Sequence, residues 1–185
     1  MRFLPLLEKF LILNSIMAFG FLVGFDFSSI WLLLSLMLLA SFYMIATPFL
    51  VQSILNKKLN DGAEIQLLLT AQVLISIAIV GILFKVMVFS GASTLLLASA
   101  LGLLFIAIVI SLKQLVYDSI ILQRIIVFGL LAAFLYWLPS TTWIRLRFWQ
   151  HPNFANSYVR YLENPGDSTA KAVWQHESSK LDPGK

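Results

Sequence analysis

The sequence predicts an all-α membrane protein: a bundle of about five transmembrane helices followed by a short C-terminal helical tail. Its composition points to this fold class, because 59% of the residues are hydrophobic and only 12% are charged. Soluble domains carry about 25% charged residues, so this chain has too little charge to cover a water-facing surface. The apolar residues also form long runs, each near the ~20 residues with which a helix crosses the hydrocarbon core.

The predicted spans cover about residues 4–25, 29–51, 65–89, 94–112 and 119–138. Helices are expected because backbone polar groups in hydrocarbon must find their hydrogen bonds within the segment. The first run is interpreted as a retained helix and not as a signal peptide, because Glu8 and Lys9 interrupt it. Short polar segments at 26–28 and 90–93 predict tight helical hairpins, and the connections 52–64 and 113–118 are longer and polar. Residues 1–138 therefore form a predicted transmembrane domain.

Basic residues favour one orientation of these spans. The side that carries the N-terminus holds Arg2, Lys9, Lys57, Lys58, Lys113 and Arg124, and the other side holds Lys85, Arg145 and Arg147. Cytoplasmic loops carry the excess of Lys and Arg, so the N-terminus is expected in the cytoplasm and the tail outside a bacterial inner membrane. Trp31 and Trp137 agree, since both fall at the outer interface. A four-span alternative would bring Arg145 and Arg147 inside but would leave one very apolar segment outside the membrane.

Residues 139–185 form a more polar tail. Apolar and basic side chains alternate over 142–149, which predicts a segment lying along the membrane interface. Pro152 suits the first position of a helix, and the sequence Asn-Pro-Gly-Asp at 164–167 predicts a turn. Asp167 or Ser168 can cap a second short helix that reaches about residue 177. The last residues, from about 178, are expected to be disordered.

Aromatic residues of the tail are its candidate partner-binding group. One helix face collects most of them, and the second predicted helix adds another: Phe154, Tyr158, Tyr161 and Trp174. A hairpin of this size is too short to form a core of its own. These side chains are therefore expected to pack on the membrane domain or on another protein.

Polar residues inside the predicted spans are few, and such groups are costly in hydrocarbon. The candidates for a polar path through the bundle are Asn14, Gln72, Ser76 and Lys85. The alternative, which is favoured, is that the uncharged ones make hydrogen bonds between helices, worth roughly 0.6–2 kcal/mol each. One amide per helix is too little to replace the hydration shell of an ion.

Charged residues near the predicted helix ends have two interpretations. Lys113, Asp118 and Arg124 are candidates for an interfacial site that binds a proton or a ligand. Long charged side chains within two turns of a helix end can instead reach the interface as anchors. Anchoring is the favoured interpretation for these residues, as it is for Glu8 with Lys9 and for Lys85.

Several classes of chemistry lack the residues that they need. The chain has no cysteine, so disulfides and thiolate metal sites are excluded. Its two histidines, His151 and His176, lie in the tail at no ligand spacing, so neither a metal site nor a haem held between spans by two histidines is expected. No nucleotide-binding or hydrolase motif occurs, and the scattered basic residues do not resemble a nucleic-acid surface. No catalytic residue, cofactor or metal is therefore predicted.

These observations favour a non-catalytic membrane subunit, or an assembly or accessory factor, of a larger inner-membrane complex. Its expected partners are the lipid bilayer and other membrane subunits or further copies of itself. The main alternative is a small transporter or channel with a polar path through the bundle. An immunity-type protein that blocks a toxin in the membrane, and an enzyme acting on lipids through Asp118, Arg124 and Lys113, remain lower alternatives.

Overall fold

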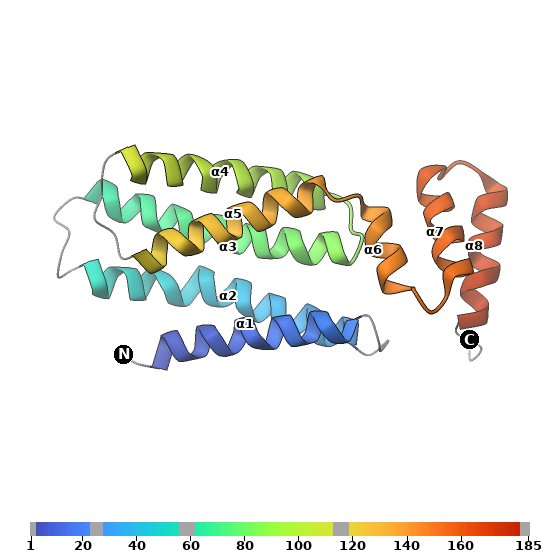
Figure 1. The fold of residues 1–185 in the computed structure, drawn as a ribbon, viewed down its shortest axis with the longest axis horizontal. Helices are drawn as coiled ribbons and strands as arrows, with labels where there is room; N and C mark the ends of the chain where they lie inside the picture. Colours follow the sequence, from blue (N-terminus) through green and yellow to red (C-terminus); the bar gives the residue numbers. More distant parts are fainter. Residues whose placement is uncertain (1–2, 23–27, 56–61, 113–118, 182–185) are drawn as a thin grey trace. The chain divides into compact units, whose positions relative to one another are not determined.

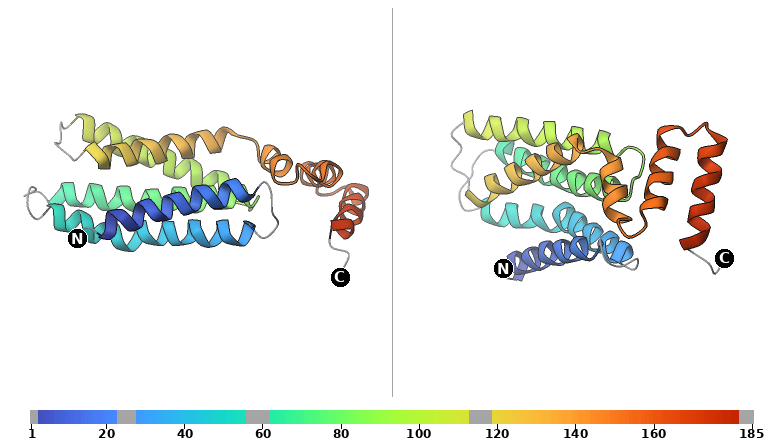
Figure 2. Two further views of the ribbon diagram at one scale, coloured as in Figure 1. Left: turned by 60° about the horizontal axis from the view of Figure 1, so that its bottom comes forward. Right: turned by 45° about the vertical axis from the view of Figure 1, so that its right-hand side comes forward.

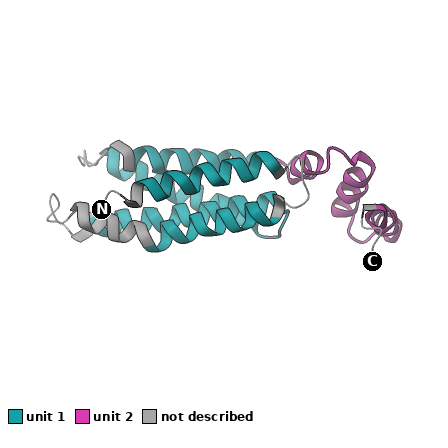
Figure 3. Ribbon diagram, turned by 90° about the horizontal axis from the view of Figure 1, so that it is seen from below, with its two compact units in different colours: residues 1–138 teal, residues 139–185 magenta. Residues whose placement is uncertain are grey.

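The computed structural model describes residues 3–22, 28–55, 62–112 and 119–181. Over these residues the chain forms eight α-helices and no strand, which confirms the all-α fold class. The helices are α1 (Phe3–Leu22), α2 (Ser28–Leu55), α3 (Gly62–Val86), α4 (Ala92–Leu112), α5 (Ser119–Trp137), α6 (Ser140–Arg147), α7 (Pro152–Glu163) and α8 (Ser168–Leu181). The chain divides into two compact units, Met1–Leu138 and Pro139–Lys185 (Figure 3).

Two helices of the described chain are long and apolar enough to cross a membrane on their own. They are Ile65–Val86, within α3, and Ala92–Leu112, which is α4. A third span results if Leu122–Trp137 and Ser140–Arg147 count as one broken segment, and the described apolar part of α2, Ile30–Ile45, is shorter. Two to three described helices are thus compatible with membrane insertion, and the number of five spans stays a prediction.

The first unit is a bundle in which consecutive helices pack side by side. α1 lies against α2, α2 against α3, α3 against α4 and α4 against α5, and α5 also contacts α3 (Figures 1 and 2). Its interior is mostly apolar, with Leu68, Ile75 and Leu103 fully buried. Large apolar side chains also cover the outside of the bundle, including Phe10, Leu13, Leu104, Phe105, Leu130 and Phe134. An outer surface of this kind suits contact with lipid or with apolar partner helices.

The hairpin between α3 and α4 begins with a well-formed helix end. The Phe89 N–H donates to the Phe84 carbonyl at 2.8 Å, and the Val88 N–H donates to the Lys85 carbonyl at 3.2 Å. These are the two bonds of a Schellman motif, and the rings of Phe84 and Phe89, 5.4 Å apart, make its usual hydrophobic contact. The predicted span 65–89 therefore ends three residues beyond the helix, because the chain turns after Val86.

Val88 occupies the position of this motif that normally belongs to glycine. Its φ is +61°, in the left-handed region, where a β-branched side chain is strained. We predict that Val88→Gly raises the free energy of unfolding by about 1 kcal/mol. Glycine removes the penalty for a left-handed conformation, and this gain is partly offset by the larger conformational entropy that glycine loses on folding. Denaturation of the purified protein in micelles measures this change. Val73→Gly, at a partly exposed position within α3, should instead lower stability; a loss in both variants would contradict the assignment of strain.

The second unit consists of α6 and the antiparallel pair α7 and α8. α7 begins at Pro152, as predicted, and the Asp167 N–H donates to the Asn164 carbonyl at 3.0 Å in the predicted turn. α8 begins at Ser168 and continues to Leu181, four residues beyond the predicted end. Of the two candidate caps, Asp167 is the one used, because its Oδ1 accepts the Thr169 N–H at 2.8 Å.

The capping bonds make the carboxyl group of Asp167 more acidic than usual. The hydroxyl and the backbone N–H of Thr169 both donate to it, and these bonds hold its pKa below the usual 3.8. A lowered pKa means that the cap contributes stability above pH 3.8 and loses it as the pH falls through the lower folded-state value. We predict that the amide resonance of Thr169 titrates with a midpoint below 3.8. Asp167→Asn should retain the cap and abolish this titration, whereas a midpoint at or above 3.8 would contradict the assignment.

Candidate functional site

A buried charge cluster joins three helices of the bundle. Glu8 of α1 is only 3% exposed. Its Oε1 accepts a hydrogen bond of 2.5 Å from the hydroxyl of Tyr43 in α2, and its Oε2 forms an ion pair with the guanidinium of Arg124 in α5. Glu8, Tyr43 and Arg124 are called the charge cluster below. Because α1 packs on α2, the ion pair adds a link from α1 to α5.

Each member of the charge cluster compensates for the burial of another. An isolated carboxylate in apolar surroundings is very costly, and it becomes tolerable when both of its oxygens accept hydrogen bonds and a cation balances its charge. The ring of Tyr43 is fully buried and packs edge-on against Phe128 of α5, with centroids 5.5 Å apart. The side chain of Arg124 keeps 25% of its surface exposed, so the cluster is accessible from the Arg124 side.

Two further polar contacts connect neighbouring helices. The indole N–H of Trp31 in α2 donates to the side-chain oxygen of Asn14 in α1 at 3.2 Å. The hydroxyl of Ser76 in α3 donates to the backbone carbonyl of Ala40 in α2 at 2.9 Å. Asn14 and Ser76 therefore have the bonding role that the favoured interpretation expected of polar residues in the spans.

Gln72 differs from these residues. Its side chain is fully buried, and neither its amide nitrogen nor its amide oxygen has a hydrogen-bond partner in the described part of the chain. The bond from Ser76 to Ala40 sets the register of the antiparallel helices α2 and α3. Gln72 lies one turn before Ser76 along α3, and Tyr43 lies three residues after Ala40 along α2. Because the two helices run in opposite directions, Gln72 and Tyr43 lie at the same depth to within about 1.5 Å. An uncompensated amide thus lies at the depth of the charge cluster.

Lys85 lies near the C-terminal end of α3, away from Gln72 and Ser76. It is 4% exposed, and no carboxylate among the described residues lies within ion-pair distance of it. The four candidate polar residues of the spans therefore do not converge: Asn14 lies between α1 and α2, Gln72 and Ser76 lie midway along α3, and Lys85 lies near its end. The structure does not bring them together in one path.

The interfacial candidates have different outcomes. Lys113 and Asp118 lie outside the described residues. Arg124 pairs with the buried Glu8, so the anchoring interpretation is wrong for Glu8, whereas the side chain of Arg124 keeps 25% of its surface exposed and its anchoring stays a prediction. Tyr43 was not a candidate at all. One signal in the sequence could have pointed to this pair. Residues 3–22 contain one carboxylate and residues 119–137 contain one cation, and opposite charges within membrane helices often pair with each other.

The aromatic residues of the tail pack on one another. Tyr158 and Tyr161 of α7 both stack on Trp174 of α8, with centroids 5.7 and 4.9 Å apart, and Phe154 stacks on Tyr158 at 6.0 Å. The expectation that this face needs another surface to pack on is therefore wrong in part, because the hairpin buries much of it internally. The indole nitrogen of Trp174 is enclosed and has no hydrogen-bond partner among the residues that the structure describes. Among the described side chains of the pair, Leu162 and Val173 are the large apolar ones that remain exposed.

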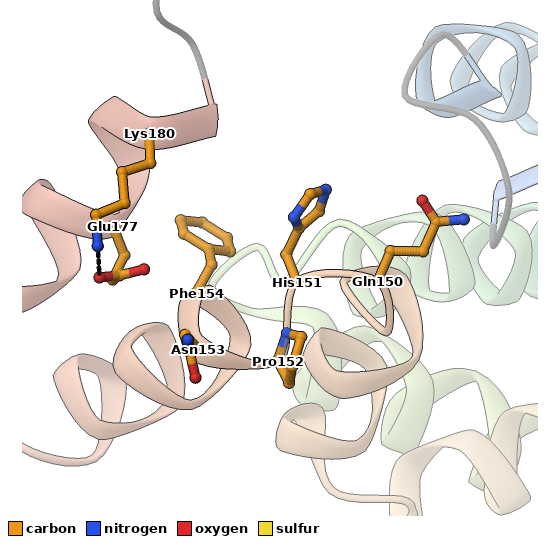
Figure 4. Close-up of a pocket in the computed structure, with 7 residues that line it drawn as sticks. All are labelled: Gln150, His151, Pro152, Asn153, Phe154, Glu177 and Lys180. Carbon is orange, nitrogen blue, oxygen red and sulfur yellow. Dashed lines mark hydrogen bonds and ion pairs between the residues drawn. The ribbon is translucent and has the colours of Figure 1, made fainter.

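A surface pocket of about 250 Å³ lies within the tail (Figure 4). It is lined by Gln150, His151, Pro152, Asn153, Phe154, Glu177 and Lys180. Figure 4 shows Glu177 paired with Lys180, and the two atoms lie 2.5 Å apart. Because this carboxylate is neutralised by Lys180, His151 has no free acidic partner from α8 in the pocket. Among the described residues, no three His, Asp or Glu side chains gather closely enough to hold a metal ion.

The described residues thus contain a buried charge cluster in the first unit and an aromatic helical pair in the second. Comparison with protein-family models, with curated proteins and with solved structures found no match for this chain.

Proposed function

We propose that this chain is a non-catalytic integral membrane subunit, or an assembly or accessory factor, of a larger inner-membrane complex. The observation that carries the proposal is that most buried polar side chains in the described part of the bundle have their hydrogen bonds satisfied within the bundle, by other side chains or by backbone carbonyls. Both carboxylate oxygens of Glu8 are occupied by Tyr43 and Arg124. A site that binds an ion or activates a substrate needs polar groups that converge on a common point and still have bonding capacity.

The proposal includes five spans, a cytoplasmic N-terminus and an extracytoplasmic tail. It is supported by the lengths of α1, α2 and α5, which have 20, 28 and 19 residues, each close to or above the ~20 that a span needs. No charged residue occurs in α2 or α4. We expect activity from a reporter enzyme that works only outside the cytoplasm when it is fused after Lys185. Activity of a reporter that works only in the cytoplasm would exclude this orientation.

The tail is proposed to bind the partner. Leu162 and Val173 remain exposed on the α7–α8 pair, and the stacked rings of Tyr158, Tyr161 and Trp174 hold its two helices together. Rigid surfaces with apolar centres bind other proteins at lower entropic cost than mobile segments. Deletion of residues 152–185 should therefore remove the partner that co-purifies with the tagged full-length chain from its native membrane.

A point variant separates loss of contact from loss of the tail. Val173→Lys places a charge on the exposed face and should remove the same partner, whereas Lys171→Ala, at an exposed position of α8, should not. If the deletion left every co-purifying protein in place, the tail would not be the binding element. A partner that proved to be a tagged second copy would identify the complex as a homo-oligomer.

Gln72 favours a second candidate function, a small transporter or channel. A buried amide with unused bonding capacity is typical of a polar path, and Gln72 lies at the depth of the charge cluster. In proteoliposomes, a transporter should produce ion or solute flux above that of empty vesicles, and Gln72→Leu should reduce it. Flux equal to that of empty vesicles would leave the subunit proposal as the better one.

A further inference from the structure

The end of α3 holds a buried cation that the charge cluster does not use. Lys85 is the only charged residue between positions 65 and 112, and it has no carboxylate partner in the described chain. The residue is only 4% exposed, but its side-chain nitrogen is not fully enclosed. The stem of Lys85 is therefore buried while its ammonium group remains accessible.

The contacts of α3 show which element Lys85 faces. A side-chain carbon added at Gly81 would lie 3.1 Å from Leu96 and 3.2 Å from Leu95, so this face of α3 lies against α4. Lys85 is one turn further along the same face. Since α3 and α4 are antiparallel, this turn lies level with the first residues of α4, near Gly91 and Ala92.

The first turn of α4 offers unused hydrogen-bond donors at that level. Its first helical bond runs from the Leu95 N–H to the Gly91 carbonyl, so the N–H groups of Ala92, Ser93 and Thr94 have no partner within the helix. A helix N-terminus carries a partial positive charge that favours anions. The hydroxyl-bearing side chains of Ser93 and Thr94 are exposed there. No carboxylate occurs in this stretch to compete for these donors.

We propose that Lys85 and the first turn of α4 together bind a phosphate group. The ammonium supplies the countercharge, and the N–H groups of Ala92, Ser93 and Thr94 supply directed hydrogen bonds. The site lies where the apolar segments Ile65–Val86 and Ala92–Leu112 meet, which is the level of lipid headgroups if these segments cross the bilayer as proposed above. The same chemistry fits a lipid phosphate or a free phosphate ion, and the experiment separates these sources.

The test uses the full-length protein purified in detergent, with phosphatidylglycerol as the probe and native mass spectrometry to count the bound lipid. Lys85→Met should weaken lipid binding about fivefold, the effect of one lysine near a headgroup, while Lys85→Arg retains binding. Lys9→Met, at an exposed position on α1, is the matched control for loss of one positive charge and should bind like the wild type. Displacement of the lipid by excess inorganic phosphate would assign the site to the free anion.

Unchanged lipid binding in Lys85→Met would overturn the proposal, as would an equal loss in Lys9→Met. Circular dichroism of each variant establishes that the helices are intact, and methionine should be tolerated because the position is buried. Extraction of native membranes with alkaline carbonate tests the membrane proposal separately. A chain that stays in the membrane but binds lipid independently of Lys85 would refute the phosphate site alone.

Discussion

Replacement of Glu8 by alanine is expected to lower the free energy of unfolding by about 3 kcal/mol, the lower end of the range for breaking a buried ion pair. The variant leaves the guanidinium of Arg124 without its countercharge and the hydroxyl of Tyr43 without its acceptor. The lower end applies because the side chain of Arg124 is 25% exposed and can regain part of its solvation. Titration of the purified protein with a denaturing detergent, followed by circular dichroism, measures the change.

Lys9→Met is the matched control for Glu8→Ala. Lys9 follows Glu8 on α1 but is exposed, so its replacement should change stability by less than about 0.5 kcal/mol. If Glu8→Ala were equally silent, the charge cluster would contribute nothing to the stability of the bundle. Such a result would also remove the observation that carries the proposed structural role.

A double-mutant cycle distinguishes pairing from simple loss of packing. Glu8→Met and Arg124→Met should each destabilise the protein. The loss of stability in the double variant should be about 2 kcal/mol smaller than the sum of the losses in the two single variants. Adding Tyr43→Phe to the double variant should recover further stability, because it removes the hydroxyl that has lost its acceptor. Additive effects of Glu8→Met and Arg124→Met would contradict a direct interaction.

The helices themselves were predictable because their signals are local. Apolar runs of about the length of a membrane span identify helices, and Pro152 and Asp167 mark the starts of α7 and α8 through fixed φ and a side-chain cap. The end of α3 was placed at 89 because Val88 and Phe89 are apolar and continue the run. The turn after Val86 depends on a valine in the conformation that glycine prefers, and composition gives no signal for that.

The charge cluster was not predictable from the same signals. Glu8 and Arg124 are 116 positions apart, and their meeting depends on how α1, α2 and α5 are rotated about their axes. Helices that are apolar on every face give no periodic pattern from which such a rotation can be inferred. The one carboxylate of 3–22 and the one cation of 119–137 are visible in the sequence, but composition does not show that these two residues meet. The stacking of Trp174 on Tyr161 likewise depends on the packing of α7 against α8.

Gln72→Met is expected to raise the free energy of unfolding by about 2 kcal/mol, which is the penalty for a buried polar group without a partner. Methionine resembles glutamine in length and volume, so it fills the same buried space without the amide. Ser76→Ala, one turn away, should have the opposite effect and cost about 1 kcal/mol, because it removes the hydrogen bond to Ala40. Denaturation of both variants in detergent, carried out in parallel, measures whether each substitution raises or lowers the free energy of unfolding.

The sign of the Gln72 effect also decides between the two proposed functions. A stabilising Gln72→Met means that the amide lacks a partner in the folded protein and that its retention costs stability, as expected of a residue kept for a polar path. Flux through proteoliposomes should then fall in this variant. A destabilising Gln72→Met means that the amide is bonded in the native membrane, most simply by ordered water or by a rotated side chain within the bundle. In that case Gln72 contributes to the structure as Asn14 and Ser76 do, and the described part of the bundle contains no unused polar group at the depth of the charge cluster.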